Sequence, residues 1–131
     1  MSQENVEVVR AGIAAWNAGD MQALRELYDP DVVMYHVDGW PEPGPSVGRD
    51  AVMRQWETQR ENFDIDAVQA VSDVIEAGDR VIVRYAWRGT GFGPDLNMEF
   101  TGVHTLRNGR ILVMEWFWDH ADALEAVGLR E

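Results

Sequence analysis

Two side chains in the middle of the chain have the chemistry to move a proton or to polarise a carbonyl group. His36 follows Val32 and Met34 at alternate positions, so its imidazole is expected in apolar surroundings. An imidazole titrates at about pH 6.5 when unperturbed, and apolar surroundings keep it neutral and basic. Tyr85 lies in a second apolar stretch, and its hydroxyl can donate a hydrogen bond to a developing oxyanion. These are the two candidate catalytic residues, with a structural histidine and a core tyrosine as the alternatives.

The other titratable candidates have simpler explanations. Glu99 is expected at the mouth of a pocket, as an acid or base or as a solvated rim carboxylate. Asp20 follows Gly19 between two helical patterns, where an aspartate more often caps a helix than reacts. Asp119 and His120 end the last strand, so they are expected to anchor or cap neighbouring elements.

The sequence predicts neither a metal nor another cofactor. The three histidines, at positions 36, 104 and 120, have no metal-ligand spacing, and alternation puts His104 on the outer face of its strand. No glycine-rich phosphate loop precedes a helix, and no serine or cysteine nucleophile has a base beside it. Any reaction is therefore expected to use the side chains of the chain alone.

Six tryptophans are many for a chain of 131 residues, and strand alternation brings several of them to one face. Buried indole N–H groups need partners, which favours a ligand-filled pocket, although the rings alone could fill a solid core. In the last strand, Phe117 faces the other way and suits a subunit contact. The predicted ligand-binding residues, turned inward or placed at the pocket mouth, are Trp16, Met34, Trp40, Trp56, Trp87, Glu99, Val103, Met114, Trp116 and Trp118.

The elements that must position these residues follow from the hydrophobic periodicity. Helical patterns cover residues 4–18, 20–28, 49–62 and 121–127. Strand patterns cover 32–37, 65–76, 80–88, 97–107 and 110–119, with tight turns at 77–79 and 108–109. Segment 38–47 carries Trp40 among prolines and is either a lid over the pocket or a plain stiff loop. Helices gathered before a run of strands predict an α+β fold.

Length and composition predict one domain over residues 1–131. The net charge of −12 opposes binding to nucleic acid and to anionic membranes. The first ten residues lack the apolar core of a signal peptide, and the chain has no cysteine, so a reducing cytoplasm is the expected location.

One family resembles this chain over nearly its whole length. The residues that carry the resemblance are the turn at 16–20 (WNAGD), the strand through His36, Gly48 before the third helix, and the closing strand with residues 116–119 (WFWD). They resemble the SnoaL-like branch of the nuclear transport factor 2 (NTF2) superfamily, which includes ketosteroid isomerases and polyketide cyclases. The resemblance implies a cone-shaped α+β barrel, with three N-terminal helices on the concave face of a strongly curved, mostly antiparallel sheet. It also implies a deep pocket and a homodimer formed through the outer sheet face.

The residue machinery of the ketosteroid isomerases is mostly missing. The position of their base corresponds to His36, whereas the positions of their two oxyanion donors correspond to Gly12 and Val103. The water-activating set of the epoxide hydrolases has no inward match either, because alternation turns Arg84 and Arg88 outward. Steroid isomerisation by that machinery is therefore not expected.

Three functions stay open on the sequence. The first is a cofactor-independent isomerase, cyclase or hydrolase-type enzyme that acts on a small apolar cyclic molecule by proton transfer. The second is a non-catalytic binding protein for an apolar small molecule. The third is a dimeric interaction domain with a vestigial pocket. The same fold supports all three, so the choice depends on the site.

Overall fold

The computed structural model describes residues 2–36, 44–63, 65–70, 74–89 and 96–128, with side chains described for 4–36, 44–61, 74–86 and 99–128. Four helices are present in these ranges: α1 (Ser2–Ala18), α2 (Met21–Glu26), α3 (Arg49–Phe63) and α4 (His120–Ala126). The strands are β1 (Tyr28–Tyr35), β2 (Ser46–Val47), β3 (Ile65–Ala70), β4 (Ile75–Ala77), β5 (Arg80–Gly89), β6 (Leu96–Arg107) and β7 (Arg110–Phe117). The predicted strand at 65–76 is thus two strands, β3 and β4.

Local chemistry explains where several elements begin and end. Gly19 adopts the left-handed conformation, with φ of +73°, and so closes α1. The carboxylate of Asp20 then accepts a hydrogen bond of 3.0 Å from the backbone N–H of Ala23, which confirms its capping role. Between β6 and β7, Asn108 and Gly109 both have positive φ, as a tight hairpin turn with right-handed strand twist requires.

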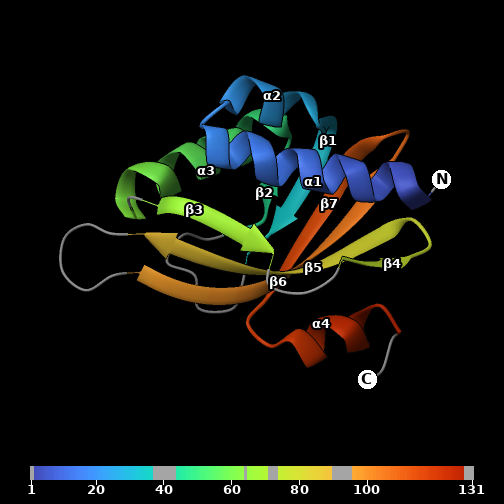
Figure 1. The fold of residues 1–131 in the computed structure, drawn as a ribbon. Helices are drawn as coiled ribbons and strands as arrows, with labels where there is room; N and C mark the ends of the chain where they lie inside the picture. Colours follow the sequence, from blue (N-terminus) through green and yellow to red (C-terminus); the bar gives the residue numbers. More distant parts are fainter. Residues whose placement is uncertain (1, 37–43, 64, 71–73, 90–95, 129–131) are drawn as a thin grey trace.

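The seven strands form one curved sheet in the order β2-β1-β7-β6-β5-β3, with β4 paired to β5. Every pairing is antiparallel except that of β1 with β7, which is parallel. Helices α1, α2 and α3 lie on one side of this sheet and α4 lies on the other (Figure 1). The predicted α+β fold, with three helices on the concave face of a mostly antiparallel sheet, is confirmed, although the sheet stays open between β2 and β3.

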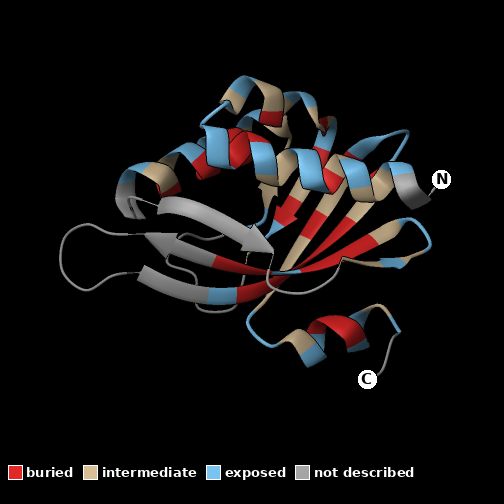
Figure 2. Cartoon of the chain, viewed as in Figure 1, coloured by how far each residue is buried: buried red, intermediate tan, exposed pale blue. Residues whose placement is uncertain are grey.

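The main core lies between the three helices and the concave face (Figure 2). It includes Val9 and Trp16 from α1, Trp56 from α3 and Met34 from β1, all less than a tenth exposed. Burying side chains of this size is the dominant favourable term in folding, at roughly 25 cal/mol per Å² of apolar surface. The predicted ligand-binding residue Met34 is therefore a fully enclosed core residue.

A smaller core lies on the convex face, under α4. Ala123 and Leu124 of α4 pack there against Ile82 and Val103, with Phe117 partly buried beside them. This contact corrects the prediction that Val103 faces the pocket. The physical reason is register: Tyr85 of β5 pairs with Phe100 of β6, and directly paired residues point to the same face.

The register of β6 then turns every second residue after Phe100 toward the helices. Gly102, His104 and Leu106 follow Phe100 on the concave face, and Leu106 joins the main core with it. The prediction that His104 faces outward is therefore wrong. Alternation shows which residues share a face, but only the pairing with β5 decides which face is the inner one.

The last strand also departs from simple alternation. A register shift between Thr105 and Leu106 of β6 lets both Ile111 and Met114 of β7 enter the main core. Strand β7 ends at Phe117, and the Trp118 side chain that follows is 48% exposed. The prediction that Trp118 lines the pocket is therefore wrong.

Candidate functional site

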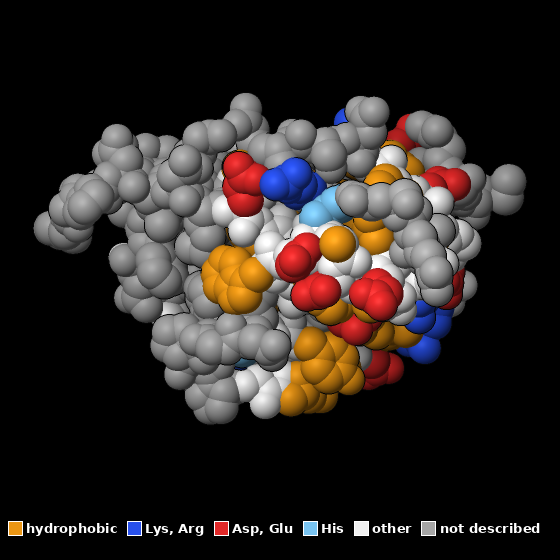
Figure 3. Space-filling model, turned by 90° about the horizontal axis from the view of Figure 1, so that it is seen from below, with side chains coloured by type: hydrophobic (Ala, Val, Ile, Leu, Met, Phe, Trp, Pro, Cys, Tyr) orange, Lys and Arg blue, Asp and Glu red, His pale blue; other side chains and the backbone are white. Residues whose placement is uncertain are grey.

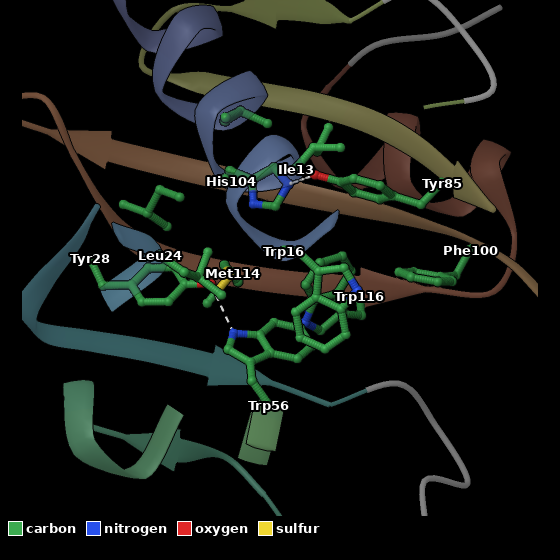
Figure 4. A pocket seen from close by; sticks show the side chains of 13 residues that line it. Ile13, Trp16, Leu24, Tyr28, Trp56, Tyr85, Phe100, His104, Met114 and Trp116 are labelled. Carbon is green, nitrogen blue, oxygen red and sulfur yellow. Dashed lines mark hydrogen bonds between the residues drawn. The ribbon is translucent and has the colours of Figure 1, made fainter. Parts of the chain in front are cut away.

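Tyr85 and His104 form a hydrogen-bonded pair between the helices and the concave face of the sheet. The hydroxyl oxygen of Tyr85 lies 2.7 Å from Nε2 of His104, and both side chains are buried. They come from neighbouring strands, β5 and β6, and Figure 4 shows both rings turned toward each other. The sequence indicated Tyr85 but placed its histidine partner on the wrong face.

Burial keeps both members of this pair uncharged. Desolvation lowers the pKa of His104 from 6.5 to about 4, because burial penalises the charged imidazolium form. Desolvation also raises the pKa of Tyr85 above its ordinary value, and the nearby Tyr28 adds to this rise. At neutral pH the pair is therefore a neutral phenol and a neutral imidazole.

A second buried hydrogen bond fixes the opposite wall. The indole N–H of Trp56 donates to the hydroxyl oxygen of Tyr28 at 2.8 Å. Burial raises the pKa of Tyr28, while this hydrogen bond opposes the rise. Trp56 thus finds its partner within the protein, so this indole does not need a ligand to satisfy it.

Trp116 is the ring that connects the pair to the helices. Its centroid lies 5.8 Å from that of Trp56, 5.7 Å from Tyr85, 5.3 Å from Phe100 and 5.5 Å from His104. Three of these four contacts are edge-to-face, the arrangement that aromatic quadrupoles prefer. The aromatic residues therefore form one continuous wall.

The third indole of the cavity, Trp16, is held by the guanidinium group of Arg60. The guanidinium carbon of Arg60 lies 4.8 Å from the Trp16 ring centroid, and the Arg60 side chain also donates to the Trp16 carbonyl oxygen at 2.9 Å. A guanidinium over an indole contributes roughly 0.5–1 kcal/mol at exposed sites and more when it is desolvated. Helix α3, which carries Arg60, is thereby fastened to the end of α1.

These side chains line a cavity of about 60 Å³, and Figure 4 shows how they lie around it. That volume is enough for a few water molecules or for a small organic group. None of the described residues that line it carries a carboxylate, an ammonium or a guanidinium group, and the titratable ones among them are Tyr28, Tyr85 and His104. The lining consists of Val9, Gly12, Ile13, Trp16, Leu24, Tyr28, Trp56, Tyr85, Phe100, His104, Ile111, Met114 and Trp116.

Five of the predicted site residues come together at this cavity. They are Trp16, Trp56, Tyr85, Met114 and Trp116. Glu99 is instead exposed and paired with Arg84, whose guanidinium lies 2.9 Å from its carboxylate. Glu99 shares the outer face with Val103, so it is a solvated surface carboxylate. Trp40 and the side chain of Trp87 lie outside the described residues.

His36 lies apart from this cavity. It follows the last residue of β1, and its Nε2 lies 3.0 Å from Oγ of Ser46 in β2. Its ring packs so closely against Gly44 that a Cβ atom there would lie 3.0 Å from Cγ of His36. His36 is not among the described residues that line the cavity. Among the described residues, the histidine that lines the cavity is His104.

Gly102 makes the pair possible. A Cβ atom at this position would lie 2.4 Å from Cζ3 of Trp116 and 3.1 Å from Cε2 of Tyr85, so both rings rest on bare backbone. On the concave face of β6, Gly102 lies between Phe100 and His104. The Tyr85 ring, which starts opposite Phe100, passes over Gly102 to reach His104. Sequence reasoning missed Gly102, although a glycine inside a strand is a signal of close approach.

Comparison with known proteins gives the family. The sequence profile of the SnoaL-like domain matches residues 9–114. The chain belongs to the SnoaL-like domain family. The curated proteins include no match to it. Among the described residues, no helix has the length and apolarity to span a bilayer, and no cluster of three or more histidine or acidic side chains could hold a metal ion.

Solved structures agree with this assignment. Bal32a, from a soil-derived mobile gene cassette, is 30% identical, with a TM-score of 0.77 and 88% of each chain covered. An NTF2-like protein of unknown function from Burkholderia pseudomallei is 25% identical, with a TM-score of 0.75 over 95% of this chain and 98% of that one. A candidate polyketide cyclase from Sinorhizobium meliloti is 24% identical, with a TM-score of 0.70 over 84% of this chain and 93% of that one. The last similarity concerns the fold alone.

Gly102, beneath the Tyr85 and Trp116 rings, and Gly12, in the cavity lining, should respond in opposite ways to substitution by alanine. Gly102→Ala should lower the free energy of unfolding by roughly 1–3 kcal/mol, because Trp116 must move away from the new Cβ. Gly12→Ala should raise it by roughly 0.5–1 kcal/mol, since a Cβ in this helix finds Leu24 and Leu27 at an ordinary 3.7 Å. Urea unfolding measures both. Equal losses would show that Trp116 does not rest on Gly102.

His104 should make the chain less stable in mild acid. Its pKa is about 4 in the folded chain and 6.5 in the unfolded chain, so the unfolded state binds the extra proton between these values. Stability should therefore be unaffected by His104 above pH 6.5, and should fall by about 3 kcal/mol between pH 6.5 and 4. Urea unfolding at several pH values should reveal this slope. His104→Gln should remove it while leaving the carboxylate contributions, and an identical slope in both proteins would contradict a buried neutral histidine.

Proposed function

We propose that the cavity binds a small apolar cyclic molecule and that the chain acts on it by proton transfer, as a cofactor-independent isomerase, cyclase or hydrolase-type enzyme. The observation that carries this proposal is the Tyr85–His104 pair, held in a cavity whose other walls are almost entirely apolar. Binding sites commonly combine apolar walls with a few polar groups that fix the orientation of the ligand. Family members include enzymes, but the fold alone does not decide the activity.

In this proposal the Tyr85 hydroxyl donates a hydrogen bond to a carbonyl oxygen of the ligand. Such a bond in a dry site stabilises the negative charge that develops as a neighbouring C–H bond loses its proton. His104 orients the phenol and is the only side chain among the described lining residues that can accept a proton as a neutral base at physiological pH. Because its pKa is low, it accepts a proton only transiently.

The size of the cavity limits the ligand. An engineered cavity of about 150 Å³ is what holds benzene in another protein, and the volume here is about 60 Å³. A ring larger than a few heavy atoms therefore requires a side chain to move. Trp116 is the candidate, since it is only partly buried whereas Trp16 and Trp56 are buried and tied to Arg60 and Tyr28.

Exchange of the α-protons of cyclopentanone for deuterium tests the reaction class. The wild-type chain should accelerate exchange in deuterated buffer, followed by proton NMR. Tyr85→Phe should reduce the rate about 100-fold, as expected when one oxyanion donor is lost. His36→Ala should leave it unchanged, because His36 lies outside the cavity. If His36→Ala instead reduced the exchange rate and Tyr85→Phe did not, His36 would be the catalytic residue and this proposal would be wrong.

Non-catalytic binding of an apolar molecule is the second candidate. Its support is that the described lining residues include no carboxylate, which is the usual strong base for proton abstraction from carbon. Cyclopentanone would then alter tryptophan fluorescence and raise the melting temperature, yet show no exchange above the rate in buffer.

We also propose a homodimer through the part of the outer face that α4 leaves open. Helix α4 covers Ile82 and Val103, while Tyr35, Val47 and Trp118 are 49%, 66% and 48% exposed. Figure 3 shows the molecule from the α4 side, with hydrophobic and acidic side chains next to one another. An interaction domain with an unused cavity would keep this dimer without any ligand.

Sedimentation of the wild-type chain and of Tyr35→Glu tests the dimer. The wild type should sediment as a dimer, and the added charge should shift it to a monomer because a carboxylate is costly to bury unpaired. Glu76→Gln, on the exposed surface of β4, is the control and should leave the dimer intact. If the wild-type chain sediments as a monomer even at high concentration, the proposed dimer is wrong.

A further inference from the structure

The second ring nitrogen of His104 is unusual. Nε2 shares its hydrogen bond with Tyr85, whereas Nδ1 is buried and finds no hydrogen-bond partner among the described residues. The side chain is only 3% exposed. In most buried histidines the bond made by one nitrogen fixes which nitrogen carries the proton. Here no described group on the Nδ1 side makes that choice.

Two arrangements of protons therefore satisfy the pair. In the first, the Tyr85 hydroxyl donates to a bare Nε2, and Nδ1 of His104 carries the proton. In the second, Nε2–H donates to the Tyr85 oxygen, which leaves the Tyr85 O–H free to donate elsewhere. A neutral imidazole has one donor and one acceptor nitrogen in either case. Both arrangements are uncharged, and each leaves one buried Nδ1 without a partner.

The electrostatic surroundings do not select between them by charge. Among the described residues, helices α1, α2 and α3 and strand β7 contribute uncharged side chains to the cavity lining. The titratable neighbours in that lining are Tyr28 and Tyr85, both kept protonated by burial. An ionised ligand would have no described counter-charge inside the cavity, and an unpaired charge there is expensive.

We propose that the Tyr85 hydroxyl is a two-way hydrogen-bonding group whose direction is set by the tautomer of His104, and that its ligands are uncharged molecules carrying a carbonyl or a hydroxyl. With Nε2 protonated, Tyr85 donates to a ligand carbonyl. With Nδ1 protonated, Tyr85 accepts from a ligand hydroxyl. This inference rests on the proposed binding role of the cavity and does not require turnover.

A two-way Tyr85 hydroxyl could hydrogen-bond to both the keto form and the enol form of one ligand. The oxygen of a ketone only accepts hydrogen bonds, whereas the O–H of its enol also donates one. Beside a group that can only donate, the enol O–H would find no acceptor, and a buried polar group left unpaired costs roughly 1–3 kcal/mol. A two-way hydroxyl keeps a partner in both forms without becoming charged.

Nitrogen NMR of the chain labelled with ¹⁵N-histidine tests the proposal directly. The ¹⁵N shifts separate protonated from bare ring nitrogens, and the chain has only three histidines to assign. Cyclopentanone, which only accepts, should shift His104 at least tenfold toward the Nε2–H form. Pyrrole, which has an N–H donor and no lone-pair acceptor, should shift it at least tenfold toward the Nδ1–H form. His36 and His120 serve as internal references.

Tyr85→Phe is the matched control, because it keeps the ring and removes only the hydroxyl. In that variant both probes should leave the His104 tautomer ratio unchanged. If the probes bind to the wild type, seen by tryptophan fluorescence, but His104 keeps one tautomer with both, the inference fails and the binding function stands. If neither probe binds, the proposed function and the inference fail together.

Discussion

The bare backbone at Gly102 is the constraint on which the site depends. Gly102 pairs with Val83 on one side and Trp116 on the other, in the middle of the sheet. Because it has no side chain, the rings of Tyr85 and Trp116 both lie against it. A Cβ there would force the Trp116 ring to move and would also crowd the Tyr85 ring that reaches His104. A glycine normally weakens a strand, so its cost here is offset by the packing it permits.

Most of the architecture could be predicted from the sequence because local patterns determine it. The helical repeat predicts α1 and α3 to within a few residues, and Gly19 with Asp20 marks the turn between α1 and α2. The pair Asn108–Gly109 predicts the β6–β7 hairpin. These features depend on neighbours a few residues apart, which a single sequence contains.

The site could be predicted only in part, because it depends on contacts between distant residues. Alternation grouped Val103 with Glu99 correctly, yet the pairing of Tyr85 with Phe100 turns that group outward and His104 inward. The register shift near Leu106 then adds Ile111 to the core. A shift of one residue in strand pairing is invisible in composition, but it exchanges the inner and outer face of a whole strand.

The three indoles around the cavity are therefore not equivalent, although the sequence presents them as one aromatic set. Trp56 is held by the Tyr28 hydroxyl, and Trp16 by the guanidinium of Arg60. Trp116 is held by ring contacts with Tyr85 and its neighbours, and these are weaker and less directional than a buried hydrogen bond. Helix α4 packs on the other side of the sheet, against Ile82 and Val103. Among the described residues, two indoles are thus held by polar contacts and the third by packing, so the proposed entry of a larger guest would displace Trp116 more easily than Trp16 or Trp56.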